Sequence, residues 1–205
     1  MGPWCTPWLW LCLHGVLQAQ ALVPLPVQPP LSQFHSEQFQ GAWFILGLAG
    51  NAFKKQDRPL LNPYTAIFEL KNNTHFEVLN SMIRGKHCDT WSYLLMPTPQ
   101  PARFTVDHGG PSIDTEHVQV VDTNYTSFAL MLSHRQAPGQ PVIRVSLLGR
   151  TWTLPPGTPD KFIRLSKAQG LMEDNIVFLV TGRGRGRGQW SWQTQCSCMT
   201  APPQP

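Results

Sequence analysis

Short runs of β-forming residues, separated by turn residues, fill residues 41–149 of the chain. No helical period in this stretch extends beyond a turn or two. The runs cover residues 43–49, 64–71, 75–84, 88–96, 103–106, 117–122, 127–134 and 142–149. Eight strands at a spacing of roughly ten residues predict an all-β fold, either an antiparallel sandwich or a barrel.

The pattern changes once, after residue 157. A threonine, a proline and an aspartate at 158–160 form a helix start, because proline is favoured near the first helical position and aspartate in the first turn. An apolar stripe at helical spacing follows, and Gly170 ends it. A short strand over residues 175–179 comes next. The expected order is therefore eight strands, one C-terminal helix and a ninth strand.

The two ends of the chain differ from its body. Residues 1–21 contain no Asp, Glu, Lys or Arg, have a short apolar centre, and end in Ala19-Gln20-Ala21, which is typical of a signal peptide. The alternative, a buried N-terminal helix, is disfavoured by the prolines in and after this segment. We expect a signal peptide at 1–21, a Pro-rich flexible lead-in at 22–36, a barrel with its helix at 37–180, and a low-complexity, disordered tail at 181–205.

Charge excludes two classes of partner. The net charge is +4, but Arg183, Arg185 and Arg187 in the Gly-Arg tail supply three of these charges. A body near neutrality would not gather nucleic acid or an acidic membrane surface. Gly-Arg repeats bind RNA in some proteins, yet three arginines on a secreted chain favour a solvated tail. The apolar segment at the N-terminus is too short to span a bilayer, so we expect neither nucleic-acid binding nor membrane insertion.

The expected pairing of the cysteines depends on secretion. Removal of residues 1–21 leaves Cys88, Cys196 and Cys198, which in an oxidising compartment implies one disulfide and one leftover thiol. Glycosylation sequons begin at Asn72 and Asn124 and suit the same compartment. The histidines show no metal-ligand spacing, so no metal and no cofactor is expected.

Three short motifs are similar to those of one family. Gly41 and Trp43 resemble its G-x-W signature in the first strand, and Asn124-Tyr125 resembles its T-D-Y turn with asparagine for aspartate. Arg150 resembles the arginine that closes its last barrel strand. All three occur in the order and spacing of the lipocalins. The chain resembles this family over residues 39–178, and its epididymal-specific members most of all.

The resemblance implies an eight-stranded antiparallel up-and-down barrel and several residue roles. The Trp43 indole should plug the closed end of the barrel, with the Arg150 guanidinium stacked over it in a cation–π contact. Those residues would then be structural. The resemblance also implies a disulfide between Cys88 and Cys196, with Cys198 free or competing for the pairing.

Alternation along the strands, aligned on the signature residues, predicts which side chains face the barrel interior. These candidate ligand-binding residues are Tyr64, Ala66, Phe68, Val78, Asn80, Met82, Trp91, Tyr93, Val118, Met131, Ser133, Arg135, Arg144 and Ser146. Eight strands permit either a cavity or a filled core. Small and polar members such as Ala66, Asn80 and Ser146 pack a dry core poorly, which favours a cavity.

Two inward arginines suggest the chemistry of the ligand. An unpaired Arg135 or Arg144 near the open end would be costly, and would become favourable on meeting a carboxylate. The alternative is that each arginine is a solvated residue at the rim. The resemblance to epididymal members implies a retinoid, so the expected ligand is all-trans retinoic acid, a fatty acid or another lipid carboxylate. Siderophore binding, known in the family, is disfavoured because Tyr93 stands at the third cationic position.

The rival class of function is an isomerase of the prostaglandin D synthase type, which needs a thiolate in the cavity. Thr65 stands at the place matched to the family's catalytic cysteine, and no cysteine occurs between Cys12 and Cys88. We therefore expect a secreted, extracellular carrier and not an enzyme. A cell-surface receptor is a further expected partner.

Overall fold

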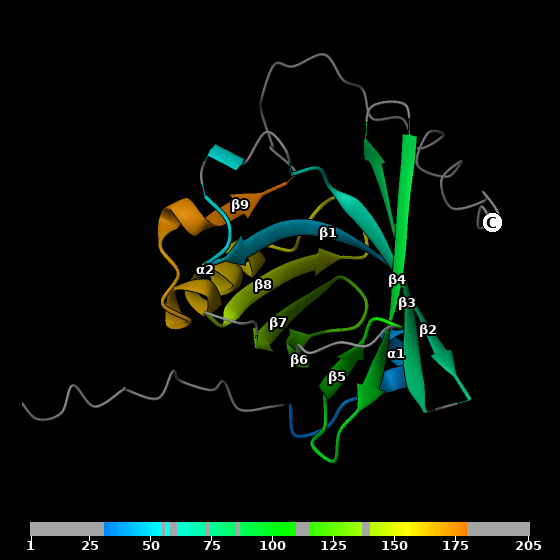
Figure 1. Ribbon diagram of the computed structural model, residues 1–205. Helices are drawn as coiled ribbons and strands as arrows, with labels where there is room; N and C mark the ends of the chain where they lie inside the picture. Colours follow the sequence, from blue (N-terminus) through cyan, green and yellow to red (C-terminus); the bar gives the residue numbers. More distant parts are fainter. Residues whose placement is uncertain are drawn as a thin grey trace, which may run out of the picture.

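The computed structural model describes residues 31–54, 56–57, 61–72, 74–84, 87–109, 115–136 and 140–179. Eight antiparallel strands follow one another around a barrel, and the pairing of β2 with β1 closes it (Figure 1). The elements are α1 (Ser36–Phe39), β1 (Gly41–Gly50), β2 (Tyr64–Lys71), β3 (His75–Arg84), β4 (His87–Pro97), β5 (Arg103–Asp107), β6 (Thr115–Thr123), β7 (Phe128–Gln136), β8 (Val142–Gly149), α2 (Thr158–Ala168), the 3₁₀ turn η2 (Glu173–Asn175) and β9 (Ile176–Phe178).

The fold predicted from the hydrophobic pattern is confirmed. All nine strands and the C-terminal helix lie where the sequence indicated, with ends that differ by at most two residues. One of these differences matters for the site, because β6 begins at Thr115 and therefore includes Glu116. The short α1 and η2 were not predicted.

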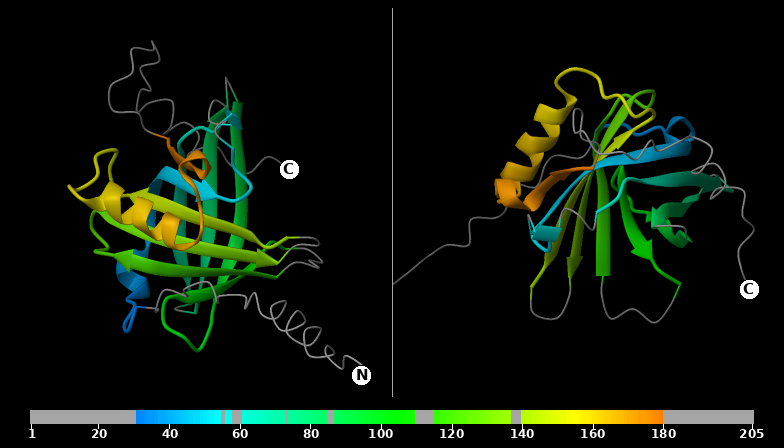
Figure 2. Two further views of the ribbon diagram at one scale, coloured as in Figure 1. Left: turned by 90° about the vertical axis from the view of Figure 1, so that its left-hand side faces the viewer. Right: turned by 90° about the horizontal axis from the view of Figure 1, so that it is seen from above.

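Two apolar clusters lie on opposite faces of the β1–β8 side of the barrel. The inner cluster fills the barrel and includes Trp43, Phe68 and Val120. The outer cluster packs α2 against β1, β7 and β8, with Phe162 and Leu147 fully buried between them. Figure 2 shows α2 lying outside the barrel wall, which is why these strands are apolar on both faces. A register shift between Ile45 and Gly47 occurs in β1, which contributes buried residues to both clusters.

Aromatic rings fill one end of the barrel. Phe39 is the centre, with ring centroids 5.1 Å from Trp43 and 5.1 Å from Phe68. Phe34 adds a ring 5.3 Å from Phe39. In the described end of the expected lead-in, Leu31 and Phe34 thus pack against the inner cluster, while Ser32, Gln33 and His35 are exposed. Burial of a phenylalanine ring is a sufficient physical reason.

Arg150 joins the segments at this closed end. Its guanidinium carbon lies 3.8 Å from the centroid of the Trp43 ring, which is the predicted stacking. Its nitrogens donate to the carbonyl oxygens of Tyr125 at 2.9 Å, Ala42 at 2.9 Å and Gln38 at 3.0 Å. The backbone requires glycine at position 41 of the G-x-W motif. Its φ is +93°, and a Cβ there would lie 3.3 Å from Arg150 Nη1.

The turn between β6 and β7 presents one of those carbonyls. The Asn124 side-chain oxygen accepts hydrogen bonds from the backbone N–H groups of Ser127 at 2.9 Å and Phe128 at 3.1 Å. Tyr125 adopts a φ of +65°, a conformation that a non-glycine residue rarely holds without such support. The asparagine that replaces the family's aspartate therefore still shapes the turn toward Arg150.

Cys88 lies on β4 and is disulfide-bonded. Its partner lies outside the described residues, as do the predicted signal peptide, residues 22–30 of the lead-in, the Gly-Arg tail, Cys196 and Cys198. The pairing of Cys88 with Cys196 therefore stays a prediction.

Replacing Arg150 by methionine should destabilise the barrel by about 2 to 4 kcal/mol, because the variant loses the cation–π contact and leaves several carbonyl oxygens without a donor. Chemical denaturation measures the free energy of unfolding. Arg164→Met, a matched change on the exposed face of α2, should stay within about 0.5 kcal/mol of the original protein. Equal stability of the two variants would contradict the role assigned to Arg150.

Candidate ligand-binding site

A pocket lies inside the barrel, beyond the aromatic end. Its lining residues come from every strand except β5 and β9 and are Ile45, Tyr64, Ala66, Phe68, Asn80, Tyr93, Val118, Met131, Ser133, Arg144, Ser146 and Leu148. The cavity measures about 40 Å³ in this structure. That is room for a few water molecules, since one needs about 10–15 Å³ by this measure.

Most of the predicted interior residues line this pocket, and four do not. Val78 is fully buried in the inner cluster at the aromatic end. Met82 is half-buried on β3. Trp91 is 38% exposed and packs on Tyr64, with ring centroids 5.3 Å apart, so it lies at the mouth. Arg135 is exposed near the end of β7 and does not line the pocket.

Ile45 and Leu148 line the pocket and were missed. Both lie on strands that also pack against α2, where apolar residues occur at consecutive positions. Alternation was nevertheless a usable signal for both, since Ile45 lies two residues after Trp43 and Leu148 lies two residues after Ser146, which the sequence already placed inward.

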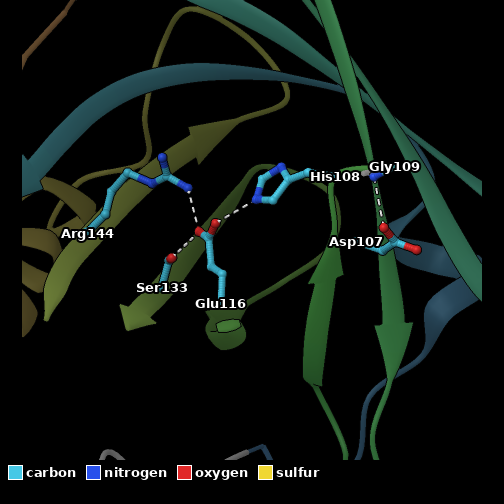
Figure 3. A network of polar contacts seen from close by, with 6 residues as sticks. All are labelled: Asp107, His108, Gly109, Glu116, Ser133 and Arg144. Carbon is cyan, nitrogen blue, oxygen red and sulfur yellow. Dashed lines mark hydrogen bonds and ion pairs between the residues drawn. The ribbon is translucent and has the colours of Figure 1, made fainter. Parts of the chain in front are cut away.

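A polar cluster adjoins the pocket through Ser133 and Arg144, and its centre is Glu116 (Figure 3). One carboxylate oxygen accepts a hydrogen bond from Arg144 Nη2 at 3.0 Å and a short one from the Ser133 hydroxyl. The other oxygen lies 3.2 Å from His108 Nε2. Glu116 is only 5% exposed, so these contacts replace the water that its charge would otherwise hold.

This cluster corrects the sequence-based view of Arg144. Arg144 does line the pocket, but its guanidinium already forms an ion pair with Glu116 and is therefore not the unpaired cation that the sequence suggested. Glu116 was missed because the predicted strand began at His117, one residue later. Alternation from Val118 would have placed Glu116 inward, had the strand been extended by one residue.

Two phenols line the pocket near this cluster. Burial raises the pKa of Tyr64, against a smaller opposing effect of Arg144. Burial also raises the pKa of Tyr93, and the nearby Tyr64 and Glu116 add to the shift while Arg144 opposes it. Both side chains therefore remain protonated and can donate a hydrogen bond at neutral pH.

Other chemistry has little support in the part of the chain that the structure describes. None of the residues that line the pocket is a cysteine. Thr65 is buried between Tyr64 and Ala66, which both line the pocket, so alternation turns its side chain to the opposite face of β2. No group of three or more His, Cys, Asp or Glu residues among those described could hold a metal ion. No helix in the same residues is both long and apolar enough to cross a membrane.

The comparisons with known proteins agree with this architecture. The family model described as lipocalin / cytosolic fatty-acid binding protein family matches residues 40–182. Human epididymal-specific lipocalin-12 is 60% identical over 151 residues, which cover 73% of this chain and 79% of that protein. The solution NMR structure of lipocalin 12 from rat epididymis superposes with a TM-score of 0.69 at 50% identity, covering 73% of this chain and 87% of the other. The canine prostaglandin-H2 D-isomerase is 33% identical over 186 residues, covering 87% of this chain and 94% of its own.

A closed up-and-down barrel with an interior pocket defines a class of proteins that enclose small molecules. The chain belongs to the lipocalin family.

The raised phenol pKa values make stability depend on pH at the alkaline end. An unfolded tyrosine ionises near pH 10, whereas folded Tyr93 keeps its proton there, so the stabilisation present below about pH 10 is lost as the pH rises toward the folded pKa. Tyr93→Phe should therefore reduce the fall in unfolding free energy between about pH 9 and about pH 11. Denaturant titrations across this range measure it. An unchanged pH dependence in the variant would contradict the burial of this phenol.

Proposed function

We propose that the protein is a secreted carrier of a retinoid or a fatty acid, held in the barrel pocket with its polar head near Arg144. The observation that carries the proposal is the polarity gradient of the pocket. Apolar and aromatic side chains such as Phe68 and Leu148 form its inner part, and the Glu116 cluster forms its polar end. This distribution suits a molecule with a long apolar body and one polar group.

The pocket must widen to admit such a ligand. Pockets for ligands of this size measure roughly 300–1,000 Å³, several times the volume present here. Tyr93 and Arg144 are the side chains best placed to move, because both line the cavity and both are only partly buried. Their rotation toward the mouth enlarges the cavity without altering the barrel backbone.

The alternatives lack the residues that they need. An isomerase of the prostaglandin type requires a thiolate in the pocket, and the lining residues of the described chain include no cysteine. Siderophore binding requires several cations that converge on an anionic ligand. Tyr93 is uncharged at neutral pH and Arg144 is already paired with Glu116. A non-enzymatic carrier is the proposal that remains.

Secretion accounts for the remaining sequence features. The segment at 1–21 is proposed as a signal peptide, and Cys88 with Cys196 as the disulfide of the mature chain. Asn72 and Asn124 are proposed as glycosylation sites, and both side chains are exposed in turns. A cell-surface receptor is a further proposed partner.

A large side chain introduced into the pocket should block binding. Ser146→Phe places a ring among Met131, Arg144 and Leu148, so we expect at least a roughly tenfold loss of affinity for retinoids and fatty acids. Quenching of tryptophan fluorescence measures the affinity, and Trp91→Phe should remove most of the signal because this indole lies at the mouth.

The matched control is Ser92→Phe, an identical substitution at an exposed position of β4. It should bind like the original protein. No binding by the original protein, or equal loss in the two serine variants, would count against the interior pocket as the ligand site.

The disulfide can be mapped in secreted protein. A tryptic fragment that joins the Cys88 peptide to the Cys196 peptide under non-reducing conditions is the expected result. The intervening Gly-rich segment can absorb the extra length, because the entropy of loop closure grows only logarithmically. A fragment that contains only a Cys88–Cys198 bond, or a Cys88 thiol that alkylates readily, would refute the assignment.

A further inference from the structure

The ion pair between Glu116 and Arg144 is unexpected in a pocket proposed to hold apolar molecules, because the Glu116 side chain is buried while that of Arg144 is 43% exposed. Taking a carboxylate out of water is costly, and an apolar side chain of similar volume would often be as stable. The Glu116 carboxylate has further polar partners, because Ser133 and His108 also contact its oxygens (Figure 3). A role in binding explains its presence better than a role in stability.

The charged and titratable groups that face Glu116 come from several strands. They are His108 after β5, Arg135 on β7, Arg144 on β8, and Tyr64 and Tyr93 on the opposite wall. Arg135 is opposite Glu116 in the strand register but is exposed, so solvent screens its charge. Asp107 turns away toward the backbone N–H of Gly109, 2.8 Å from it (Figure 3). Arg144 is therefore the cation that directly meets the carboxylate inside the pocket.

We propose that Glu116 determines the head-group specificity of the pocket, as an internal carboxylate that a ligand carboxylate must replace on Arg144, with uptake of one proton. This inference rests on the proposed carrier function and concerns the class of ligand that the carrier accepts. Glu116 thereby discriminates between lipid acids and the corresponding alcohols.

The proton follows from charge balance. Glu116 and Arg144 together are neutral, so a ligand carboxylate that enters as an anion leaves two negative charges facing one guanidinium in a site with little water. Two carboxylates that share such a site do not both stay ionised. The contact between Arg144 and Glu116 breaks, a contact between Arg144 and the ligand forms, and one proton taken from solvent remains between the two carboxylates.

A neutral head group has a different requirement. The hydroxyl of an alcohol can donate to Glu116 and accept from Arg144 or from a phenol, and the ion pair stays in place. No proton is taken up. Binding of the acid should consequently weaken as the pH rises, whereas binding of the alcohol should not.

The test measures the affinity of the full mature chain for retinoic acid, retinol and the methyl ester of retinoic acid across the neutral pH range. Because the slope of log affinity against pH equals the number of protons taken up, the affinity for the acid should fall close to tenfold for each pH unit. The alcohol and the ester should show no slope. An acid affinity that does not change with pH, or a slope shared by all three ligands, would overturn the inference.

The variant Glu116→Gln removes the competing charge and keeps the shape of the side chain. We expect it to bind retinoic acid about tenfold more tightly at neutral pH, because Arg144 is then unpaired and gains a charge-assisted contact. The pH slope for the acid should disappear, and the affinity for retinol should change little. A slope that persists in this variant overturns the inference.

The matched control is Glu69→Gln, which removes an exposed carboxylate from the outer face of β2 and should bind all three ligands like the original protein. If Glu116→Gln does not fold, the comparison of acid, alcohol and ester on the original protein decides alone. Failure of the original protein to bind any retinoid or fatty acid overturns the proposed function as well. Binding of the acid and the alcohol without a difference in pH dependence overturns only the role of Glu116.

Discussion

The stacking of Arg150 on Trp43 is the contact on which the closed end of the barrel depends. A single guanidinium covers the indole face and donates to backbone carbonyls from α1, β1 and the turn between β6 and β7. An arginine suits this position because its planar group can stack and donate in several directions at once. Burial lowers the pKa of this guanidinium, but arginine remains charged in proteins. Once this end is closed, the aromatic rings beneath it have fixed surroundings, and any cavity must lie toward the other end.

The barrel wall then separates two environments. Buried inward positions on β3 and on the first part of β6 alternate with more exposed outward ones, as a strand period of two requires. The strands β1, β7 and β8 differ, because α2 covers their outer face and makes both faces apolar. The result is a pocket with an apolar inner part on a wall that α2 supports from outside. The location of α2 thus matters for the pocket although none of its residues lines it.

The polar end of the pocket combines two opposing demands. The proposed carriage of a lipid requires apolar surface, but a buried charge requires partners, and Glu116 obtains them from Ser133, Arg144 and His108. The same contacts occupy the groups that a ligand head would use. The cavity of about 40 Å³ therefore lies beside a carboxylate whose hydrogen-bonding positions are already occupied.

The sequence by itself determined the order of the strands and the closing helix, because these rest on periodicity, turn chemistry and spacing along the chain. The roles of Gly41, Trp43 and Arg150 were implied by the resemblance of their motifs to those of the lipocalins. The sequence also identified much of the pocket, including Ala66, Asn80 and Ser146, because one inward residue on a regular strand fixes the others.

Only the tertiary structure decided what the interior does with its charges. Glu116 meets Arg144 across 28 positions of the chain and a separate strand, and no local pattern records such a pairing. Ile45 and Leu148 lie opposite each other where β1 pairs with β8, so both line the same side of the pocket. Phe34 is packed although its segment is rich in proline, since an aromatic ring gains more from burial than its backbone loses in freedom. Each of these outcomes depends on which strands become neighbours, and that is a property of the closed barrel.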